Sequence, residues 1–202
     1  MADEEIAAAL RAATSGDESG IAVLWRALQP AVLRYLRVVV GDAAEDVASE
    51  TWLQAVRGLH TFVGDARAFR VWLFRIARHR GIDERRRQGR RREDALELVG
   101  EVADRSAAAR DVAQDAIEAN ELKWALRLIA QLPPDQGEAV MLRVVAGLDV
   151  AQTAQVLQKR PGAVRVATMR GLRKLAADPR VQERRATASA FPRTDGAPVE
   201  GV

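Results

Sequence analysis

Apolar residues recur every three or four positions through most of the chain, which is the period of helices with one buried face. The first such stripe runs over residues 17–39, and Pro30 within it predicts a kink or a split of that helix. A second stripe predicts a helix over 42–59, and a third, after a loop at 61–65, predicts one that ends near Arg87. The residues expected to be buried by these stripes are Ile21, Leu24, Trp25, Leu28, Val32, Leu36, Val39, Ala44, Val47, Ala48, Thr51, Trp52, Ala55, Val56, Leu59, Phe69, Trp72, Leu73, Ile76 and Ala77.

Residues 88–120 are rich in alanine and acidic side chains and carry no comparable stripe, which predicts a flexible linker. The period resumes at Leu122, stops at Pro133 and Pro134, and resumes over 135–146 until Gly147. Three further signals define the end of the chain. Asp149 and Gln152 form a capping-box pattern that opens a helix through Leu157, Pro161 stands at the start of a last helix that ends near Ala177, and a tail rich in Ala, Pro, Gly and Arg follows.

The composition supports helices almost throughout. Ala, Leu, Arg, Glu and Gln dominate over β-branched and aromatic residues, and Pro30 is the one proline of seven that precedes Pro133. The sequence therefore predicts an all-α protein of two small helical domains joined by a flexible acidic linker. The predicted segments are a first domain over 1–92, the linker over 93–121, a second domain over 122–178 and a disordered tail over 179–202.

Several functional classes are disfavoured by what the 202 residues lack. No apolar run approaches the roughly 18–20 residues that cross a bilayer, and the first residues are acidic where a signal peptide is basic, which predicts a cytoplasmic protein without a membrane contact. There is no cysteine, the two histidines are His60 and His79, and no phosphate-binding or zinc-protease motif is present. We therefore expect no catalytic residue, no metal site and no cofactor, and hence a protein that is not an enzyme.

The net charge of +3 is the sum of alternating acidic and basic blocks along the chain. Residues 1–66 sum to −5, 67–92 to +9, 93–121 to −7, 122–185 to +7 and the remaining tail to −1. A basic patch on a folded domain attracts a polyanion, so two separated basic blocks indicate two contacts on one nucleic acid. The alternative, that these arginines only solvate helix faces, stays open on charge alone.

The last two predicted helices, joined by a turn of a few residues, have the organisation of a helix-turn-helix whose second helix enters the major groove. Projection of the last helix places one set of residues on the core side: Val164, Ala167, Thr168, Gly171, Leu172 and Leu175. The opposite face carries the candidate DNA contacts: Arg165, Val166, Met169, Arg170, Arg173 and Lys174. An arginine there can bind guanine with two hydrogen bonds while its neighbours hold phosphates. A basic helix pair in an ordinary helical bundle is the alternative.

The first basic block contains two arginine triplets, 85–87 and 90–92, at the end of a predicted helix. These triplets form either a phosphate clamp or a solvated helix end. Phe62, Phe69, Trp72 and Phe74 lie nearby in the sequence and could stack on unpaired bases. For Phe69 and Trp72 a place in the core is favoured, because both lie in the buried stripe.

Two stretches resemble a known family. Residues 42–57 (DAAEDVASETWLQAVR), 62–65 (FVGD) and 69–78 (FRVWLFRIAR) resemble region 2 of the extracytoplasmic-function sigma factors of bacterial RNA polymerase. Residues 132–136 (LPPDQ), 140–148 (VMLRVVAGL) and 161–175 (PGAVRVATMRGLRKL) resemble region 4 of the same family. The resemblance covers both predicted domains in the family's order and leaves out the linker and the tail.

The resemblance implies a role for each set of residues. Asp46, Glu50, Thr51 and Trp52 match positions that dock on the largest subunit of the polymerase. Contacts with the melted −10 element are implied for Phe62, Val63, Gly64, Asp65, Arg75, Arg78, His79 and Asp83. Contacts with the −35 duplex are implied for Arg165, Val166, Met169 and Arg170, beside which the helix projection places Arg173 and Lys174.

The leading hypothesis is a sigma factor that binds core RNA polymerase and directs promoter-specific initiation, with region 2 reading and melting the −10 element and region 4 reading the −35 element. The acidic linker would then occupy the polymerase's RNA path as a nucleic-acid mimic. An autonomous helix-turn-helix regulator is the alternative, and a nucleic-acid-processing enzyme is disfavoured because no acidic or metal constellation appears. Core RNA polymerase and promoter DNA are the expected partners, and the resemblance adds an anti-sigma protein as a candidate.

Overall fold

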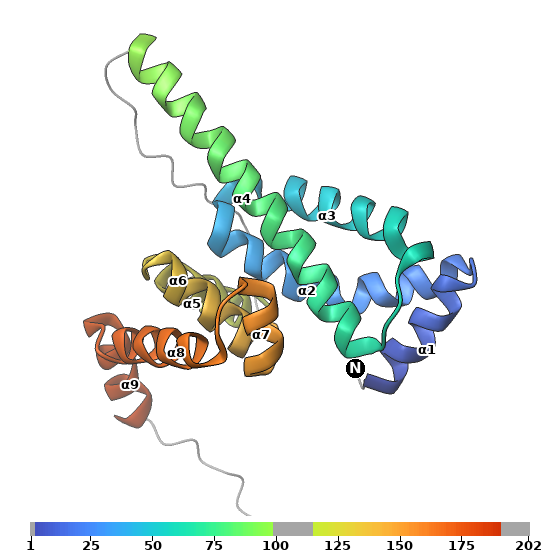
Figure 1. Ribbon diagram of the computed structural model, residues 1–202. Coiled ribbons are helices and arrows are strands. Elements are labelled where there is room, and N and C mark those ends of the chain that lie inside the picture. The colour runs from blue at the N-terminus through green and yellow to red at the C-terminus, as the bar shows by residue number, and fades with distance from the viewer. Residues whose placement is uncertain (1–2, 99–114, 191–202) are drawn as a thin grey trace, which may run out of the picture.

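The all-α prediction is confirmed over the residues that the computed structural model describes, 3–98 and 115–190 (Figure 1). The helices are α1 (Asp3–Thr14), α2 (Glu18–Val40), α3 (Ala44–Gly58), α4 (Ala66–Leu98), α5 (Asp115–Ala130), α6 (Pro134–Val140), α7 (Val150–Leu157), α8 (Pro161–Ala176) and α9 (Pro179–Ala190). Single 3-10 turns at Gly41–Ala43 and Leu59–Thr61 flank α3, and a π-helical stretch, Met141–Val145, extends α6. Within the described ranges, no helix combines the length and the apolar character that a bilayer crossing requires.

Helix α2 is the central element of the first half. Its stripe of Leu24, Leu28, Val32 and Leu36 is buried, and the carboxylate of Asp17 caps its start by accepting a hydrogen bond from the Ser19 amide at 2.8 Å. The predicted split at Pro30 does not occur, because α2 continues as one helix from Glu18 to Val40. Burial of its stripe on both sides of the exposed proline outweighs the roughly 3 kcal/mol that an internal proline costs.

Two stripe positions that the sequence predicted as buried are exposed. Trp25 on α2 and Val56 on α3 have 47% and 42% of their surface accessible. Periodicity marks a face about 100° wide, and these residues lie at its edge, where no further helix of the described chain covers them. Their exposure leaves an apolar surface between α2 and α3.

Helix α4 is longer than predicted and runs to Leu98, beyond the expected end near Arg87. The added residues, 88–98, are mostly good helix formers, and just before them ion pairs one turn apart join Arg86 to Asp83 and Arg87 to Glu84. Figure 1 shows this part of α4 extending away from the other helices. Helix α4 thus covers the first residues of the segment predicted as a linker, and α5 covers its last ones. The part of that linker between them, residues 99–114, lies outside the described residues.

Three features of the second half confirm local sequence signals. The side chain of Asp149 accepts from the Gln152 amide and the side chain of Gln152 accepts from the Asp149 amide, both at 2.8 Å, which completes the capping box of α7. Pro161 occupies the first turn of α8. Gly147, with φ +69°, follows the π-helical stretch and turns the chain toward α7.

The predicted disorder of the tail is wrong for its first part, because Pro179–Ala190 forms α9. The guanidinium of Arg184 lies 4.6 Å from the ring centre of Trp124 and pairs with Glu121 at 2.5 Å. Arg180 reaches Gln131 at 2.7 Å. These contacts with α5 and with the residue that follows it join residues about fifty to sixty positions apart, which no local pattern reveals. Residues 191–202 of the predicted tail lie outside the described residues.

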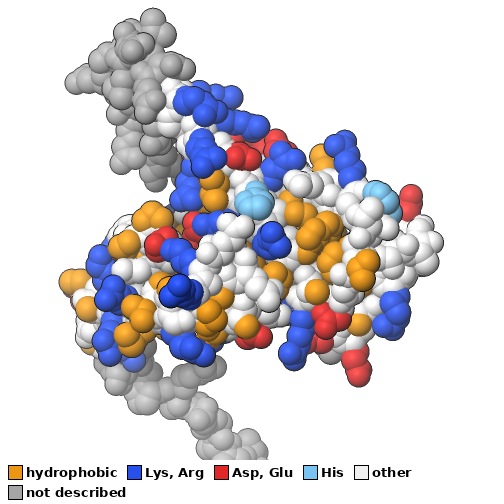
Figure 2. All heavy atoms as spheres, in the orientation of Figure 1, with side chains coloured by type: hydrophobic (Ala, Val, Ile, Leu, Met, Phe, Trp, Pro, Cys, Tyr) orange, Lys and Arg blue, Asp and Glu red, His pale blue; other side chains and the backbone are white. Residues whose placement is uncertain are grey.

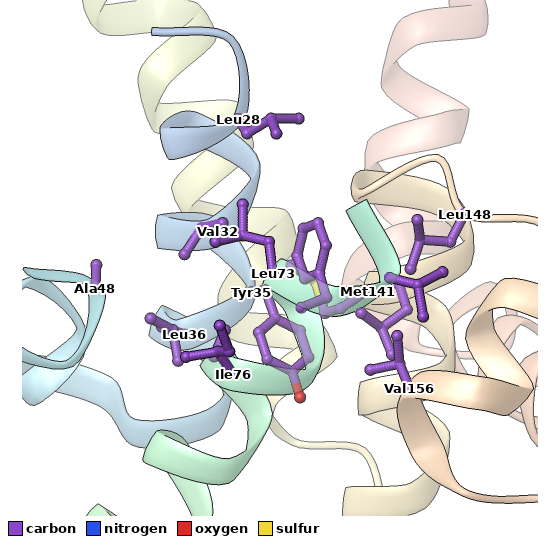
Figure 3. Close-up of a cluster of buried hydrophobic side chains, with 14 of the residues drawn as sticks. Leu28, Val32, Tyr35, Leu36, Ala48, Leu73, Ile76, Met141, Leu148 and Val156 are labelled. Carbon is purple, nitrogen blue, oxygen red and sulfur yellow. The ribbon is translucent and has the colours of Figure 1, made fainter. Parts of the chain in front are cut away.

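The two halves, α1–α4 and α5–α8, share one continuous apolar core. Figure 3 shows Tyr35 of α2 and Leu73 of α4 beside Met141, Leu148 and Val156 of the second half. Helix α2 packs against α5 and α6, and α4 packs against α7. The chain therefore brings its two basic surfaces together on one folded body.

Candidate nucleic-acid interface

The helix-turn-helix consists of α7, a short turn and α8. Gln158 leaves α7 in the left-handed conformation at φ 56°, and Arg160 is extended before Pro161 starts α8. Lys159 in the turn pairs with Asp135 of α6 at 2.5 Å. The backbone conformations of Gln158 and Arg160 thus set the direction in which α8 leaves the turn.

Close packing on α6 sets the rotation of α8. Val164 is fully buried, and Gly171 lies so near Val140 that an added Cβ would come within 2.8 Å of that side chain. With this face turned inward, the six predicted contacts are exposed on the other side: Arg165, Val166, Met169, Arg170, Arg173 and Lys174. We call these six residues the α8 surface. Figure 2 shows basic side chains gathered around this helix.

The cations of the α8 surface are unpaired. In the part of the chain that the structure describes, Arg165, Arg170, Arg173 and Lys174 form no ion pair. Exposed guanidinium groups on a rigid helix can form bidentate hydrogen bonds with a guanine edge or a phosphate without first losing a protein partner. The α8 surface can thus bind an anion without first releasing a partner within the protein.

One residue assigned to the core side of α8 is not buried. Leu172 has 44% of its surface exposed, and it lines an open hollow of about 510 Å³ with Val150, Met169 and the aliphatic part of Arg143. The sequence projection missed this hollow because helical periodicity does not show where neighbouring elements leave a residue uncovered. An apolar floor with arginines at its rim therefore adjoins the α8 surface.

The 62–65 loop, at the start of α4, holds the first four candidates for the −10 element. The ring of Phe62 packs against Phe69 and Trp72, with ring centres 5.5 and 5.1 Å apart, whereas Val63 is 94% exposed. The carboxylate of Asp65 accepts from the Ala68 amide at 2.8 Å and so caps α4. At Gly64 an added Cβ would lie 2.8 Å from that of Ala68, so the loop follows the helix closely.

The core assignment favoured for Phe69 is confirmed, since 1% of its surface is exposed, and Trp72 is partly buried beside it. Phe62 completes the same aromatic cluster. The ring of Phe62 is held by its contacts with Phe69 and Trp72, whereas Val63 is the exposed tip of the loop.

Arginines of α4 between 67 and 87 are mostly paired, unlike those of α8. These pairs are Arg67 and Arg70 with Asp3, Arg78 and Arg85 with Glu138, Arg80 with Glu50, Arg86 with Asp83, and Arg87 with Glu84. Among the −10 candidates on this helix, Arg75, His79 and Asp83 are exposed. The fourth, Arg78, is turned away from solvent, with 17% of its side chain accessible. Arg78 thus differs from the other three −10 candidates on α4 in being mostly hidden from solvent.

Arg78 points toward the second half of the chain. Its Nε donates to the carboxylate of Glu138 at 2.8 Å, and Nη2 of Arg85 lies 3.3 Å from the other oxygen of that carboxylate. The hydroxyl of Tyr35, which is fully buried, lies 3.5 Å from Glu138. Burial first, and then the nearby Glu138 carboxylate, raise the pKa of Tyr35 well above its ordinary value.

The four residues predicted to dock on the polymerase divide into two pairs. Asp46 and Glu50 are exposed one turn apart on α3. Thr51 is fully buried and its hydroxyl donates to the Val47 carbonyl at 2.7 Å, so in this structure its side chain offers no surface to a partner, and its place in the docking site stays a prediction. A threonine inside the buried stripe turns inward with that stripe. Trp52 is 7% exposed, and its indole N–H donates to Gln29 at 2.7 Å.

An apolar groove beside these residues was not predicted. It has a volume of about 560 Å³ and lies between α2 and α3, with Trp25, Trp52 and Val56 on its walls. Leu53, 58% exposed, continues the apolar surface on α3. The clue in the sequence was that α3 is apolar at 52, 53 and 56, which is wider than one buried stripe needs.

His60 and His79 are both exposed. Among the residues described, no three His, Cys, Asp or Glu side chains gather where they could hold a metal ion. The candidate interface therefore consists of charged and apolar surfaces on α3, α4 and α8.

Two family models match the chain in sequence. The model of Sigma-70 region 2 matches residues 24–91, which span most of α2, all of α3 and most of α4. The model of Sigma-70 region 4 matches residues 122–175, which span most of α5 to α8. Helices α1 and α9 lie outside both matches.

Curated relatives match over most of their lengths. The ECF RNA polymerase sigma factor SigD of Mycobacterium tuberculosis is 34% identical over 181 residues, covering 87% of this chain and 84% of the relative. The ECF RNA polymerase sigma factor ShbA of Streptomyces griseus is 33% identical over 187 residues, covering 88% of this chain and 98% of the relative.

Solved structures share the fold. CnrH in complex with the cytosolic domain of CnrY aligns with a TM-score of 0.61 at 22% identity, covering 86% of this chain and 96% of that one. The sigma factor RpoE of Bartonella quintana, in complex with the anti-sigma factor NepR, aligns with a TM-score of 0.56 at 20% identity, covering 75% and 91%. The helical arrangement of both halves thus has solved counterparts.

Proposed function

Since this chain belongs to the ECF RNA polymerase sigma factors, we propose how its surfaces divide the work of promoter recognition. As a sigma factor it binds core RNA polymerase and directs promoter-specific initiation, with its region 2 half serving the −10 element and its region 4 half the −35 element. The single observation that carries this function is the order of the two regions along one chain. An autonomous helix-turn-helix regulator is not favoured, because such a protein does not require a region 2 half.

The α8 surface reads the −35 element as duplex. Its first exposed arginine, Arg165, lies one turn from the helix start, and Arg170 follows on the same face. A helix in this position presents its N-terminal part to base edges and its later cations, Arg173 and Lys174, to phosphates. Each bidentate contact with guanine contributes about 1–3 kcal/mol of discrimination.

The 62–65 loop and the exposed side of α4 receive the melted −10 strand. Extruding a base costs a few kcal/mol, which a pocket for the extruded base offsets. Phe62 supplies an aromatic wall held by Phe69 and Trp72, and Val63 projects beside it. Asp65 fixes this loop to the helix start, and Arg75 and His79 face solvent farther along α4, where phosphates of the strand would pass.

Helix α3 docks on the polymerase through Asp46 and Glu50. Both carboxylates are exposed on one face, and the apolar groove with Trp25 and Trp52 lies on the neighbouring side of α3. Charged side chains around an apolar patch are typical of a protein interface. Thr51 supports this face from inside the core.

The segment of charge −7, residues 93–121, connects the domains proposed over 1–92 and 122–178. Its charge suits a positively charged nucleic-acid path of the polymerase, where it would act as a mimic of RNA. Helix α9 adds a contact to α5 after the second domain.

The family is one of non-enzymatic initiation factors, and we extend this to the chain itself, without cofactor or metal. We place the protein in the cytoplasm, where promoter DNA and polymerase are found. An anti-sigma protein is a further proposed partner, since a structural relative at 20% identity was solved with the anti-sigma factor NepR.

Run-off transcription with core RNA polymerase and mapping of start sites test this function. Product from specific promoters is expected when the chain and core enzyme are both present. The absence of a promoter-specific product across a genomic template library would refute it.

Docking is tested by a matched pair of charge removals on α3. Asp46→Asn is expected to weaken binding to core enzyme several-fold, because an exposed interface charge is lost. Glu45→Gln removes the same charge at the neighbouring exposed position, where Glu45 pairs with Arg37 on the surface, and is expected to bind as the unmodified chain does. Equal affinities of the two variants would refute the docking assignment.

A further inference from the structure

Glu138 joins the two halves of the molecule through a buried polar cluster. It lies on α6, in the region 4 half, with 7% of its side chain accessible. Its three partners come from the region 2 half: Arg78 at 2.8 Å, Arg85 at 3.3 Å and Tyr35 at 3.5 Å. We call these four residues the Glu138 cluster. No helix-local geometry explains it, since the partners lie 53 to 103 positions away in sequence.

The cluster is a property of the closed arrangement. A buried carboxylate without partners is strongly unfavourable, so Glu138 is stable at this depth only while both guanidinium groups face it. Apolar contacts surround the cluster, and Figure 3 shows Tyr35 and Leu73 packed beside Met141. Separation of the two halves would return Glu138, Arg78 and Arg85 to solvent.

The same arginines lie on the helix to which we assign the melted −10 strand. A phosphate and a carboxylate make the same demand on a guanidinium group, namely parallel N–H donors and a positive charge. Arg78 and Arg85 are seven positions apart on α4 and thus share one face. While Glu138 occupies them, they cannot bind phosphate.

We propose that Glu138 is an intramolecular latch, which holds the free protein closed by occupying an Arg78–Arg85 phosphate site on α4 until a single-stranded nucleic acid displaces it. The latch rests on the proposed function, because the displacing strand is the melted promoter DNA of that proposal. Displacement of Glu138 also frees the region 4 half to move away from α4. In free protein it also suppresses binding to stray nucleic acid.

The first test measures binding of the full-length chain to a fluorescent single-stranded DNA oligonucleotide, with no polymerase present. Glu138→Gln keeps the shape of the side chain and removes its charge, and it is expected to bind about tenfold more tightly, given the strength of hydrogen bonds between charged groups. Asp135→Asn is the matched control, because it removes the same charge from the same helix at an exposed position paired with Lys159. Equal affinities of the two variants would overturn the latch.

The second test follows the closed arrangement itself. The chain has no cysteine, so Ser15→Cys and Gln155→Cys, both exposed and in opposite halves, accept a donor and an acceptor dye. Glu138→Gln is expected to shift the energy-transfer distribution toward greater separation, whereas Asp135→Asn leaves it unchanged. Added oligonucleotide should produce the same shift in the unmodified chain. An unchanged distribution in Glu138→Gln would overturn the proposal.

If Glu138→Gln does not fold by circular dichroism, Arg85→Gln replaces it in the energy-transfer test, because Arg85 is partly exposed and its loss removes one arm of the cluster. The two proposals fail separately. Neither latch measurement needs polymerase, so a chain that opens but yields no run-off product refutes the sigma function alone. A chain that directs transcription but never opens on Glu138→Gln refutes the latch alone.

Discussion

The two basic surfaces of this molecule differ in whether their cations are already engaged. On α8, Arg165, Arg170, Arg173 and Lys174 face solvent without an ion pair in the described chain, whereas on α4 most arginines between 67 and 87 lie against carboxylates. Net charge alone would rank α4 as the stronger nucleic-acid surface, since its block carries +9 against +7. Pairing reverses that ranking for the free protein.

The difference teaches how each surface gains its ligand. A free guanidinium binds DNA by displacing water and counterions, so α8 can act as it stands. A paired guanidinium must exchange one anion for another, so binding on α4 is coupled to a change in the protein. The exchange is local at Arg80, whose partner Glu50 lies on the adjoining α3, and interdomain at Arg78, whose partner Glu138 lies in the other half.

The largest effect is expected from shortening a buried aromatic side chain of α4. Phe69→Ala removes a fully buried ring that supports Phe62 and Trp72, which should lower the free energy of unfolding by about 3–5 kcal/mol. Because both halves share one core, urea denaturation followed by circular dichroism should show one transition at a lower midpoint. A separate transition for the second half at its original midpoint would show that the two halves do not share a core.

A smaller effect is expected when an arginine of the α8 surface is removed. Arg165→Ala and Arg170→Ala should each cost about 1–3 kcal/mol of −35 recognition, a roughly 5- to 150-fold fall in initiation at −35-dependent promoters. Arg127→Ala, which removes an exposed arginine of α5 instead, is the control and should leave initiation unchanged. Measurement is by run-off transcription on templates with intact and scrambled −35 elements. Equal losses on both templates would mean that these arginines do not read sequence.

High pH should weaken the Glu138 cluster through Tyr35. The pKa of Tyr35 is raised by burial and by Glu138, so its contribution to stability is complete below its ordinary pKa of 10.0 and is lost as the pH rises toward its folded value. Above pH 10 the free energy of unfolding should therefore fall more steeply, by up to about 1.4 kcal/mol per pH unit, than in Tyr35→Phe. Tyr35 is the single tyrosine, so tyrosinate absorbance reports it directly. Parallel curves for the two proteins would contradict this reading of the cluster.

The smallest expected effect compares one free cation with one paired cation. Lys174→Ala should reduce the slope of log affinity against log salt for promoter binding by about one, because a phosphate contact is lost. Arg80→Ala removes the same charge, but Arg80 lies 3.6 Å from Glu50 and donates to Gln54, so the slope should change little. Equal changes in the two slopes would show that pairing on α4 does not affect its availability to DNA.

Much of the fold could be predicted because its signals are local. Apolar periodicity placed α2, α3 and the start of α4, and the Asp149–Gln152 capping box and Pro161 placed the helix-turn-helix. The exposed face of α8 was predicted in full, because a sixteen-residue helix with one buried stripe leaves little choice for the other side. Leu172 was the error, since it is exposed although the projection placed it on the core side.

Predictions failed where distant residues decide. Helix α9 depends on Trp124 and Glu121 of α5, and the exposure of Trp25 depends on which helices cover α2. At Thr51 two expectations differed: the apolar period predicted burial, which the structure shows, and the resemblance implied a polymerase contact, which stays a prediction. For α9 and Trp25 the outcome turned on the packing of elements that are distant in sequence.

The sequence by itself determined that this protein is helical, that it carries two basic helical regions in a particular order, and that one of them ends in a helix-turn-helix. These features follow from residue spacing within one or two turns. Only the tertiary structure decided which arginines are free. Whether a guanidinium faces water or a carboxylate depends on which helices pack together, and the meeting of Glu138 with Arg78 across 60 residues leaves no trace in local spacing.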